Sequence, residues 1–164
     1  MKILLTGAIG VGKSTVVEGA LRLWRGSFGG FRTARCPGGY RIVDLSTGRA
    51  ALIARKGSRG LIHNPSAFES LGVEAITNAL LSKELLVMDE LGFLELAAPR
   101  FQAAVFAALR SKKPVLGVLK RERNGFLDGI RALSEVTLIE VRKDNRDGLP
   151  LEIAQLLGAE VLMR

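Results

Sequence analysis

The stretch KILLTGAIGVGKSTVVEGALRLW, residues 2–24, contains three different sequence patterns in immediate succession. Residues 2–6 form a short, mainly apolar run, which predicts a strand buried on both faces of a parallel sheet. Residues 7–15 are rich in glycine, and residues 16–24 repeat their apolar side chains at helical spacing. This order predicts a buried strand, a glycine loop and a helix.

The glycine loop matches the pattern G-x-x-x-x-G-K-S, which is typical of phosphate-binding loops. Glycine allows consecutive backbone N–H groups to point at phosphate oxygens, and the following helix adds its positive N-terminal end. Lys13 can reach the β- and γ-phosphates, and the hydroxyl of Ser14 can bind Mg²⁺. The residues predicted to bind nucleotide are Gly7, Ala8, Ile9, Gly10, Val11, Gly12, Lys13, Ser14, Thr15 and, far along the chain, Arg146.

The second informative stretch is LLVMDELGFLE, residues 85–95, in which four apolar residues lead directly into Asp89 and Glu90. Two adjacent carboxylates at the end of a buried strand are unfavourable unless a cation lies nearby. A magnesium–triphosphate complex would supply that cation, so we predict that Asp89 and Ser14 bind the metal. Glu90 can then deprotonate the water that attacks the γ-phosphate, and Glu90 and Lys13 are the predicted catalytic residues.

Several other basic side chains are weaker candidates for contact with the phosphates. Lys120 ends an apolar segment and is a candidate sensor of the γ-phosphate, with a solvated lysine as the alternative. Arg32, Arg35 and Arg41 could clamp phosphate or act as an arginine finger, and a surface position is the alternative for each.

Apolar strands that alternate with helices predict a parallel sheet covered by helices on both faces. The later strands are predicted at residues 84–88, 114–120 and 135–141, and the later helices at residues 65–82, 98–111, 125–133 and 147–158. We expect one α/β domain over residues 1–164, because no linker, repeat or low-complexity segment divides the chain.

Residues 30–55 follow a different pattern, with alternating side chains and the turn sequences PGG and STG. This pattern predicts a β-hairpin insertion of two or three segments. Residues 56–65 are predicted to be a mobile loop. Ser66 and Glu69 have the spacing of a capping box at the start of the next helix.

The composition excludes several classes of protein. Hydrophobic residues make up 48% of the 164 residues, which excludes a disordered chain. We see neither a signal peptide nor an apolar run long enough to span a membrane, so no membrane partner is expected. Cys36 is the only cysteine, which excludes a disulfide framework and favours the cytoplasm.

The formal net charge of +8 predicts polyanionic partners. The bias is local, because residues 22–59 contain nine basic residues and one acidic residue. Nucleotides such as ATP and GTP are the expected partners, and nucleic acid at this basic surface is a further possibility, although only 5% of residues are aromatic. Nothing in the sequence fixes the oligomeric state, and a monomer is favoured.

Four motifs, GAIGVGKST, GGFRTARCPGGYRIVDLSTG, VMDELGFLEL and NRD, resemble in this order the small P-loop nucleoside-triphosphatase family, which includes the cancer-related nucleoside-triphosphatase and its thermophile relatives. The resemblance implies a RecA-like α/β fold and Mg²⁺-dependent hydrolysis of nucleoside triphosphates to diphosphate and phosphate, with broad base tolerance. The chain departs from relatives at Ala34 and Arg35, where they usually have acids, and at Phe93, where they usually have lysine. The resemblance carries over Gly7, Gly12, Lys13, Ser14, Asp89, Glu90, Gly92, Glu95, Asn145, Arg146 and Asp147.

Two other functions remain open at this point. A nucleotide or small-metabolite kinase would use the arginine-rich segment as a lid, but it has no use for a base that activates water. The third possibility is a binding module, either a nucleotide-dependent switch or a nucleic-acid adaptor. The guanine-reading string N-K-x-D is absent, which argues against a conventional GTPase switch, but the basic surface keeps RNA or DNA binding open. Because no arginine finger occurs at a motif position, we expect slow basal hydrolysis that a partner accelerates.

Overall fold

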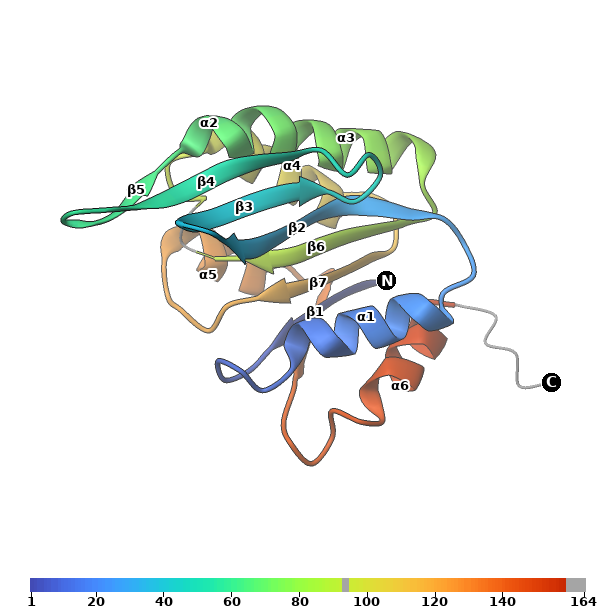
Figure 1. The fold of residues 1–164 in the computed structure, drawn as a ribbon. Coiled ribbons are helices and arrows are strands. Elements are labelled where there is room, and N and C mark those ends of the chain that lie inside the picture. The colour runs from blue at the N-terminus through green and yellow to red at the C-terminus, as the bar shows by residue number, and fades with distance from the viewer. Residues whose placement is uncertain (93–94, 159–164) are drawn as a thin grey trace.

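Eight strands form one sheet in the order β5-β4-β3-β2-β6-β7-β1-β8 (Figure 1). The computed structural model describes residues 1–92 and 95–158. The strands are β1 (Lys2–Thr6), β2 (Phe28–Cys36), β3 (Gly39–Asp44), β4 (Ala50–Gly57), β5 (Gly60–His63), β6 (Leu85–Leu91), β7 (Val115–Leu119) and β8 (Val136–Glu140).

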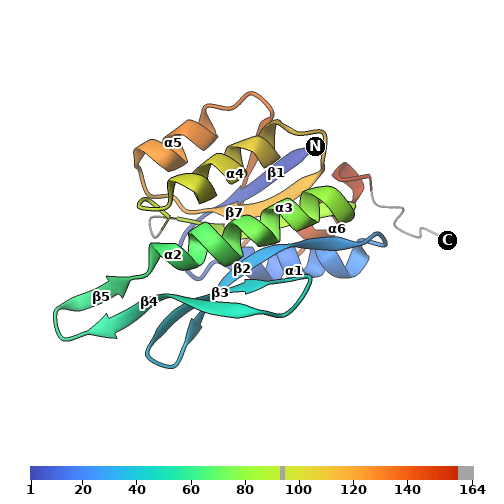
Figure 2. The same ribbon diagram turned by 90° about the horizontal axis from the view of Figure 1, so that it is seen from above.

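Helices cover both faces of this sheet (Figures 1 and 2). They are α1 (Lys13–Leu23), α2 (Pro65–Ala67), a π-helical segment η1 (Phe68–Gly72), α3 (Val73–Ser82), α4 (Pro99–Arg110), α5 (Gly125–Arg131) and α6 (Leu149–Leu156). One core lies beneath α1 and α6, and a second lies beneath α3, α4 and α5. The predicted α/β fold with helices on both faces is therefore confirmed. No helix among the described residues is long and apolar enough to cross a membrane.

The strands β2, β6, β7, β1 and β8 pair in parallel. β1, β6 and β7 are apolar on both faces and almost completely buried, as expected for strands covered by helices on two sides. The carboxyl ends of parallel strands lie at one edge of a sheet. This edge therefore brings together Gly7 after β1, Glu90 near the end of β6, and Lys120 after β7.

The strands β3, β4 and β5 extend the sheet in antiparallel fashion, which confirms the predicted hairpin insertion. The prediction of a mobile loop at residues 56–65 is wrong, because β4 continues to Gly57 and pairs with β5. A tight turn is possible there because Gly60 has a φ of 111°. The side chains of β5 are exposed along its length, so no buried alternation marks it as a strand. In Figure 1 this hairpin extends away from the body of the molecule.

The predicted capping box is also wrong. Asn64 occupies the N-cap position without a side-chain bond to the helix backbone, and the hydroxyl of Ser66 donates to its Oδ1 at 2.5 Å. The carboxylate of Glu69 instead accepts the backbone N–H of Arg100, at 3.0 Å and 3.1 Å. Glu69 therefore links two helices across the sheet face rather than closing the first turn of its own.

Candidate functional site

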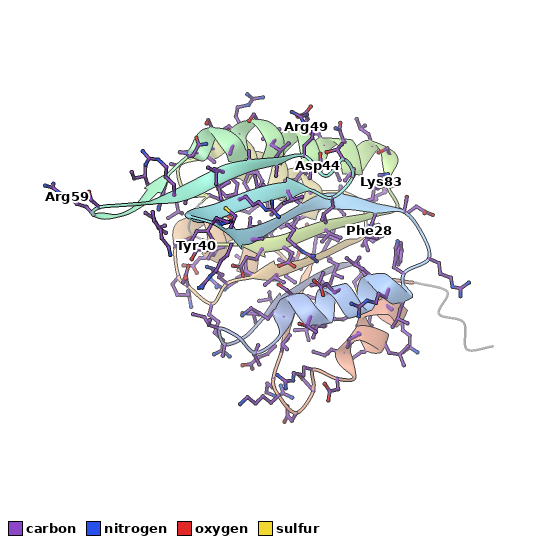
Figure 3. The ribbon with its side chains drawn as sticks, viewed as in Figure 1. Phe28, Tyr40, Asp44, Arg49, Arg59 and Lys83 are labelled. Carbon is purple, nitrogen blue, oxygen red and sulfur yellow. The ribbon has the colours of Figure 1, made fainter. Side chains whose placement is uncertain are left out.

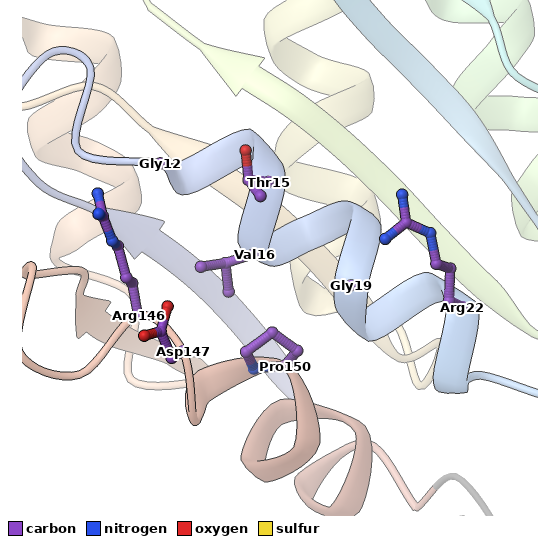
Figure 4. A pocket seen from close by; sticks show the side chains of 8 residues that line it. All are labelled: Gly12, Thr15, Val16, Gly19, Arg22, Arg146, Asp147 and Pro150. Atoms are coloured by element: carbon purple, nitrogen blue, oxygen red, sulfur yellow. The ribbon is translucent and has the colours of Figure 1, made fainter.

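The glycine loop connects β1 to α1 and folds around the amine of Lys13. Gly12 has a φ of 108° and directly precedes α1 (Figure 4), a conformation that glycine adopts without strain. A side chain at Gly7 would meet the carbonyl oxygen of Val141 at 2.8 Å, so the loop also needs glycine where it leaves β1. The amine of Lys13 donates to the carbonyls of Gly7, at 2.8 Å, and Ala8, at 3.0 Å. Desolvation lowers the pKa of Lys13.

Ser14, in the first turn of α1, and Asp89, on β6, meet although 75 residues separate them in the sequence. The hydroxyl of Ser14 donates to Oδ1 of Asp89 at 3.2 Å. Asp89 is only 2% exposed, and its Oδ2 has no hydrogen-bond partner among the described residues. Burial raises the pKa of Asp89 to about 6, and the charge of Arg32 and the hydrogen bond from Ser14 oppose this rise. A buried carboxylate with an unsatisfied oxygen beside a serine hydroxyl suits a hard cation.

Arg32 lies beside this pair rather than in a cavity. Its Nε is 3.5 Å from Oδ2 of Asp89, and its Nη1 is 3.3 Å from Oε1 of Glu18 on α1. The guanidinium is therefore shared between two carboxylates. This arrangement leaves Arg32 poorly placed to clamp phosphate.

Glu90 occupies an irregular position in β6. The β6–β7 register shifts between Asp89 and Leu91, so Glu90 has no partner residue on β7. Its backbone N–H donates to Oγ1 of Thr33 at 3.4 Å. Its carboxylate lies 3.4 Å from the amine of Lys120, and both side chains are about one-third exposed, at 30% and 32%. Glu90 therefore has access to solvent, whereas the adjacent Asp89 does not.

A cavity of about 790 Å³ is lined by Lys13, Ser14 and Glu90. Its walls are the glycine loop, the start of α1, the end of the β2–β3 hairpin, Glu90 and residues 120–122. Of the loop residues predicted to bind nucleotide, all except Val11 line it. Val11 packs its side chain into the core beneath α1 instead. We call this space the phosphate cavity.

A second cavity, of about 460 Å³, lies between α1 and residues 146–150 (Figure 4). Gly12 and Thr15 line both cavities, so the two adjoin at the start of α1. Arg146 donates from Nη1 to the carbonyl of Val11 at 3.1 Å, which holds its guanidinium beside the loop. The dimensions suit a nucleoside whose phosphates occupy the first cavity.

The turn after β6 is held by Glu95, which is buried and accepts the backbone N–H of Gly92 at 2.9 Å. Burial raises the pKa of Glu95 to about 7.

Two further residues singled out in the sequence are Phe93 and Asn145. Phe93 lies outside the described residues. The side chain of Asn145 spans its own loop, accepting from the N–H of Arg142 at 2.7 Å and donating to the carbonyl of Glu140 at 2.9 Å.

Sequence reasoning missed several cavity residues. Thr33, Tyr40, Arg121 and Glu122 line the phosphate cavity, and Arg22 lines the second. Arg121 and Glu122 directly follow the end of β7, so the rule that ligands bind at strand ends would have found them. Tyr40 carries no such signal, because only the fold of the hairpin brings it to this edge. Arg41, which the sequence left open, lines neither cavity.

The NTPase family model matches residues 2–154. The chain belongs to this family. It is 40% identical over 168 residues to nucleoside-triphosphatase THEP1 of Methanosarcina acetivorans, with coverage of 93% of this chain and 94% of that protein.

Two solved structures show the same architecture. The crystal structure of THEP1 from Aquifex aeolicus has a TM-score of 0.83 and 27% identity, covering 96% of this chain and 99% of that one. The solution structure of a human cancer-related nucleoside triphosphatase has a TM-score of 0.78 and 25% identity, covering 95% of this chain and 96% of that one. The predicted family and its nucleoside-triphosphatase class are confirmed.

Proposed function

We propose that this protein hydrolyses nucleoside triphosphates, ATP and GTP among them, to the diphosphate and phosphate in a Mg²⁺-dependent reaction. The observation that carries the proposal is the meeting of three groups at one edge of the sheet. Ser14 lies 3.2 Å from the buried Asp89, and the solvent-accessible Glu90 follows Asp89 beside the glycine loop. Family membership favours hydrolysis over phosphoryl transfer to a second substrate.

The glycine loop binds the phosphates. Its backbone N–H groups and the start of α1 attract phosphate oxygens. The amine of Lys13 donates to the carbonyls of Gly7 and Ala8. When substrate binds, it donates to the β- and γ-phosphates instead. The exchange replaces two neutral acceptors by charged ones, which strengthens both bonds.

Ser14 and Asp89 hold the metal. Their oxygens are the ligand type that Mg²⁺ prefers, and Oδ2 of Asp89 has no hydrogen-bond partner in the described part of the chain. When bound, Mg²⁺ neutralises charge that develops on the phosphate oxygens. No cluster of three or more His, Cys, Asp or Glu side chains suited to a metal occurs among the described residues, so substrate phosphates complete the site.

Glu90 activates the water. It takes a proton from the water while the water oxygen forms a bond to the γ-phosphorus. The bond from that phosphorus to the bridging oxygen breaks, and its electron pair remains on the nucleoside diphosphate. Lys120, 3.4 Å from the carboxylate, orients Glu90, and it also lines the phosphate cavity, where its amine can reach the γ-phosphate.

The nucleoside occupies the second cavity. Arg146, held by the carbonyl of Val11, contacts the ribose or base beside Thr15. A planar guanidinium stacks on any base, which is consistent with broad base tolerance.

Hydrolysis is tested by supplying ATP, GTP, CTP or UTP in water enriched in ¹⁸O, with Mg²⁺ or with EDTA. We expect Mg²⁺-dependent release of phosphate that carries one ¹⁸O atom, because water is the nucleophile. Phosphate that appears on an added nucleotide or metabolite, with no labelled phosphate released, would establish the kinase alternative. Release that is equal in EDTA would contradict the metal site.

A further inference from the structure

Four basic side chains among the described residues line the phosphate cavity, and three of them already have polar partners. Lys13 donates to two loop carbonyls, at 2.8 Å and 3.0 Å. Lys120 lies 3.4 Å from the carboxylate of Glu90, and Arg121 forms an ion pair with Glu140. These three cations are therefore partly neutralised or held by the protein before substrate binds.

Arg35 is the exception. Its guanidinium carbon lies 6.0 Å from the ring centroid of Tyr40, and it forms no ion pair with any acid in the part of the chain that the structure describes. The side chain is exposed and lines the cavity from the hairpin side. A cation without a counter-charge at the mouth of an anion-binding cavity is available to a ligand.

The fold places Arg35 at this mouth. β2 pairs in parallel with β6, with Arg32 opposite Asp89, and Arg35 follows three residues further toward the same edge. On the other side Arg35 pairs with Tyr40 of β3, which also lines the cavity. Figure 3 shows Tyr40 at the end of the hairpin, on the side of the sheet where the glycine loop lies. The hairpin thus forms the wall opposite the loop.

We propose that Arg35 is an arginine finger that the chain supplies to its own site. It contacts the γ-phosphate of the bound triphosphate and stabilises the charge that develops as the bond to the bridging oxygen breaks. Arg35 transfers no proton, since that role belongs to Glu90. The inference rests on the proposed hydrolysis, and it selects Arg35 from the three arginines that the sequence left open.

The other two arginines that the sequence singled out do not compete for this role. Arg32 is shared between Glu18 and Asp89. Arg41 pairs with Ala34 of β2 but does not line the cavity. Arg41 is exposed on the same hairpin, so Arg41→Ala is a matched control for the loss of one positive charge.

The test measures phosphate release at saturating Mg²⁺ and ATP for wild type, Arg35→Ala, Arg35→Lys and Arg41→Ala. We expect kcat to fall about 100-fold in Arg35→Ala and less in Arg35→Lys, with KM changed less than about threefold. Arg41→Ala should stay within about twofold of wild type. A thermal melt of each variant shows whether it is folded.

A second measurement uses an analogue of the transition state to test whether Arg35 stabilises it. We expect wild type to trap ADP with Mg²⁺ and aluminium fluoride, and Arg35→Ala to bind ADP equally well but fail to trap it. Normal turnover and normal trapping in Arg35→Ala would overturn the role of Arg35 and leave hydrolysis intact. Absence of release from wild type would contradict the proposed hydrolysis and, with it, the finger.

Discussion

The parallel strands β6, β7 and β1 and the antiparallel strands β3, β4 and β5 differ in what they bury. The first group is apolar on both faces and lies within the core. In the second group burial falls along the order of the strands: β3 has one exposed residue, β4 has four, and β5 is exposed along its length. The groups that we propose to bind phosphate, to bind metal and to activate water lie at the carboxyl ends of the parallel strands or in the loop that follows β1, whereas the hairpin contributes a wall and Arg35.

This difference has a physical reason. A catalytic group must be held within a fraction of an ångström, and buried strands with neighbours on both sides provide such support. An exposed hairpin has fewer packed neighbours and opens more easily. Apart from the proposed contribution of Arg35, we therefore expect the chemistry to depend on the buried parallel strands, and the following variants test this expectation.

The largest expected effect separates two lysines. Lys13→Ala removes the amine that we propose to bind the phosphates, and we expect hydrolysis to fall by at least about 1,000-fold. Lys56→Ala removes an exposed amine of β4, and we expect hydrolysis within about twofold of wild type. Phosphate release at matched protein concentration measures both. Equal losses would show that the antiparallel half carries chemistry as well.

The next test compares two glycines with positive φ. A side chain at Gly30, where φ is 116°, would collide with the backbone of Val87 on β6. A side chain at Gly60, where φ is 111°, meets no atom within 4 Å. We expect Gly30→Ala to lower the free energy of unfolding by more than about 4 kcal/mol and Gly60→Ala by about 1 kcal/mol. Urea unfolding measures both free energies. Similar losses would contradict the view that the buried strands are held more tightly than the exposed hairpin.

The third test uses the acid buried after β6. Burial raises the pKa of Glu95 from 4.5 to about 7, so the folded protein retains a proton that the unfolded chain releases between these values. The free energy of unfolding of wild type should therefore fall as pH rises through this window. Glu95→Gln does not ionise, so it should gain on the order of 3 kcal/mol relative to wild type between pH 4.5 and pH 7.

Denaturant unfolding at a series of pH values, without metal or nucleotide, provides the measurement. Glu74→Gln is the control, because Glu74 is 52% exposed. A difference between wild type and Glu95→Gln that does not change with pH would show that Glu95 titrates normally.

The smallest expected effect concerns the surface ion pair between Arg49 and Glu74. The two atoms lie 3.5 Å apart and the side chains are 66% and 52% exposed. Solvent screens such pairs, so Arg49→Ala should change the free energy of unfolding by less than about 0.5 kcal/mol. A larger loss would mean that the turn before β4 is held more firmly than its exposure indicates.

The sequence predicted the parallel half well because its signals are local. A continuously apolar run marks a strand covered on both faces, and the glycine loop marks the start of α1. The predicted first strand, residues 2–6, has the bounds of β1. Asp89 and Glu90 were predicted to follow the strand, whereas β6 includes both and ends at Leu91.

The antiparallel half was harder to predict because its signals are not local. The strand β5 exposes all of its side chains, so no apolar pattern distinguishes it from a loop. The N-cap position of Asn64 was missed because Ser66 and Glu69 have the spacing of a capping box. The sequence left Arg32, Arg35 and Arg41 equivalent, and only strand pairing places one of them in the cavity.

The central claim is that Glu90 activates water at the end of a buried strand. The most direct measurement is single-turnover release of phosphate from Mg²⁺–ATP by wild type and Glu90→Gln, together with the affinity for Mg²⁺–ATP. Glu152→Gln, an exposed acid on α6, is the control. We predict that release by Glu90→Gln falls at least about 100-fold while its affinity stays within about threefold of wild type. Unchanged release by Glu90→Gln, or a loss of affinity that accounts for the slower release, would contradict the claim.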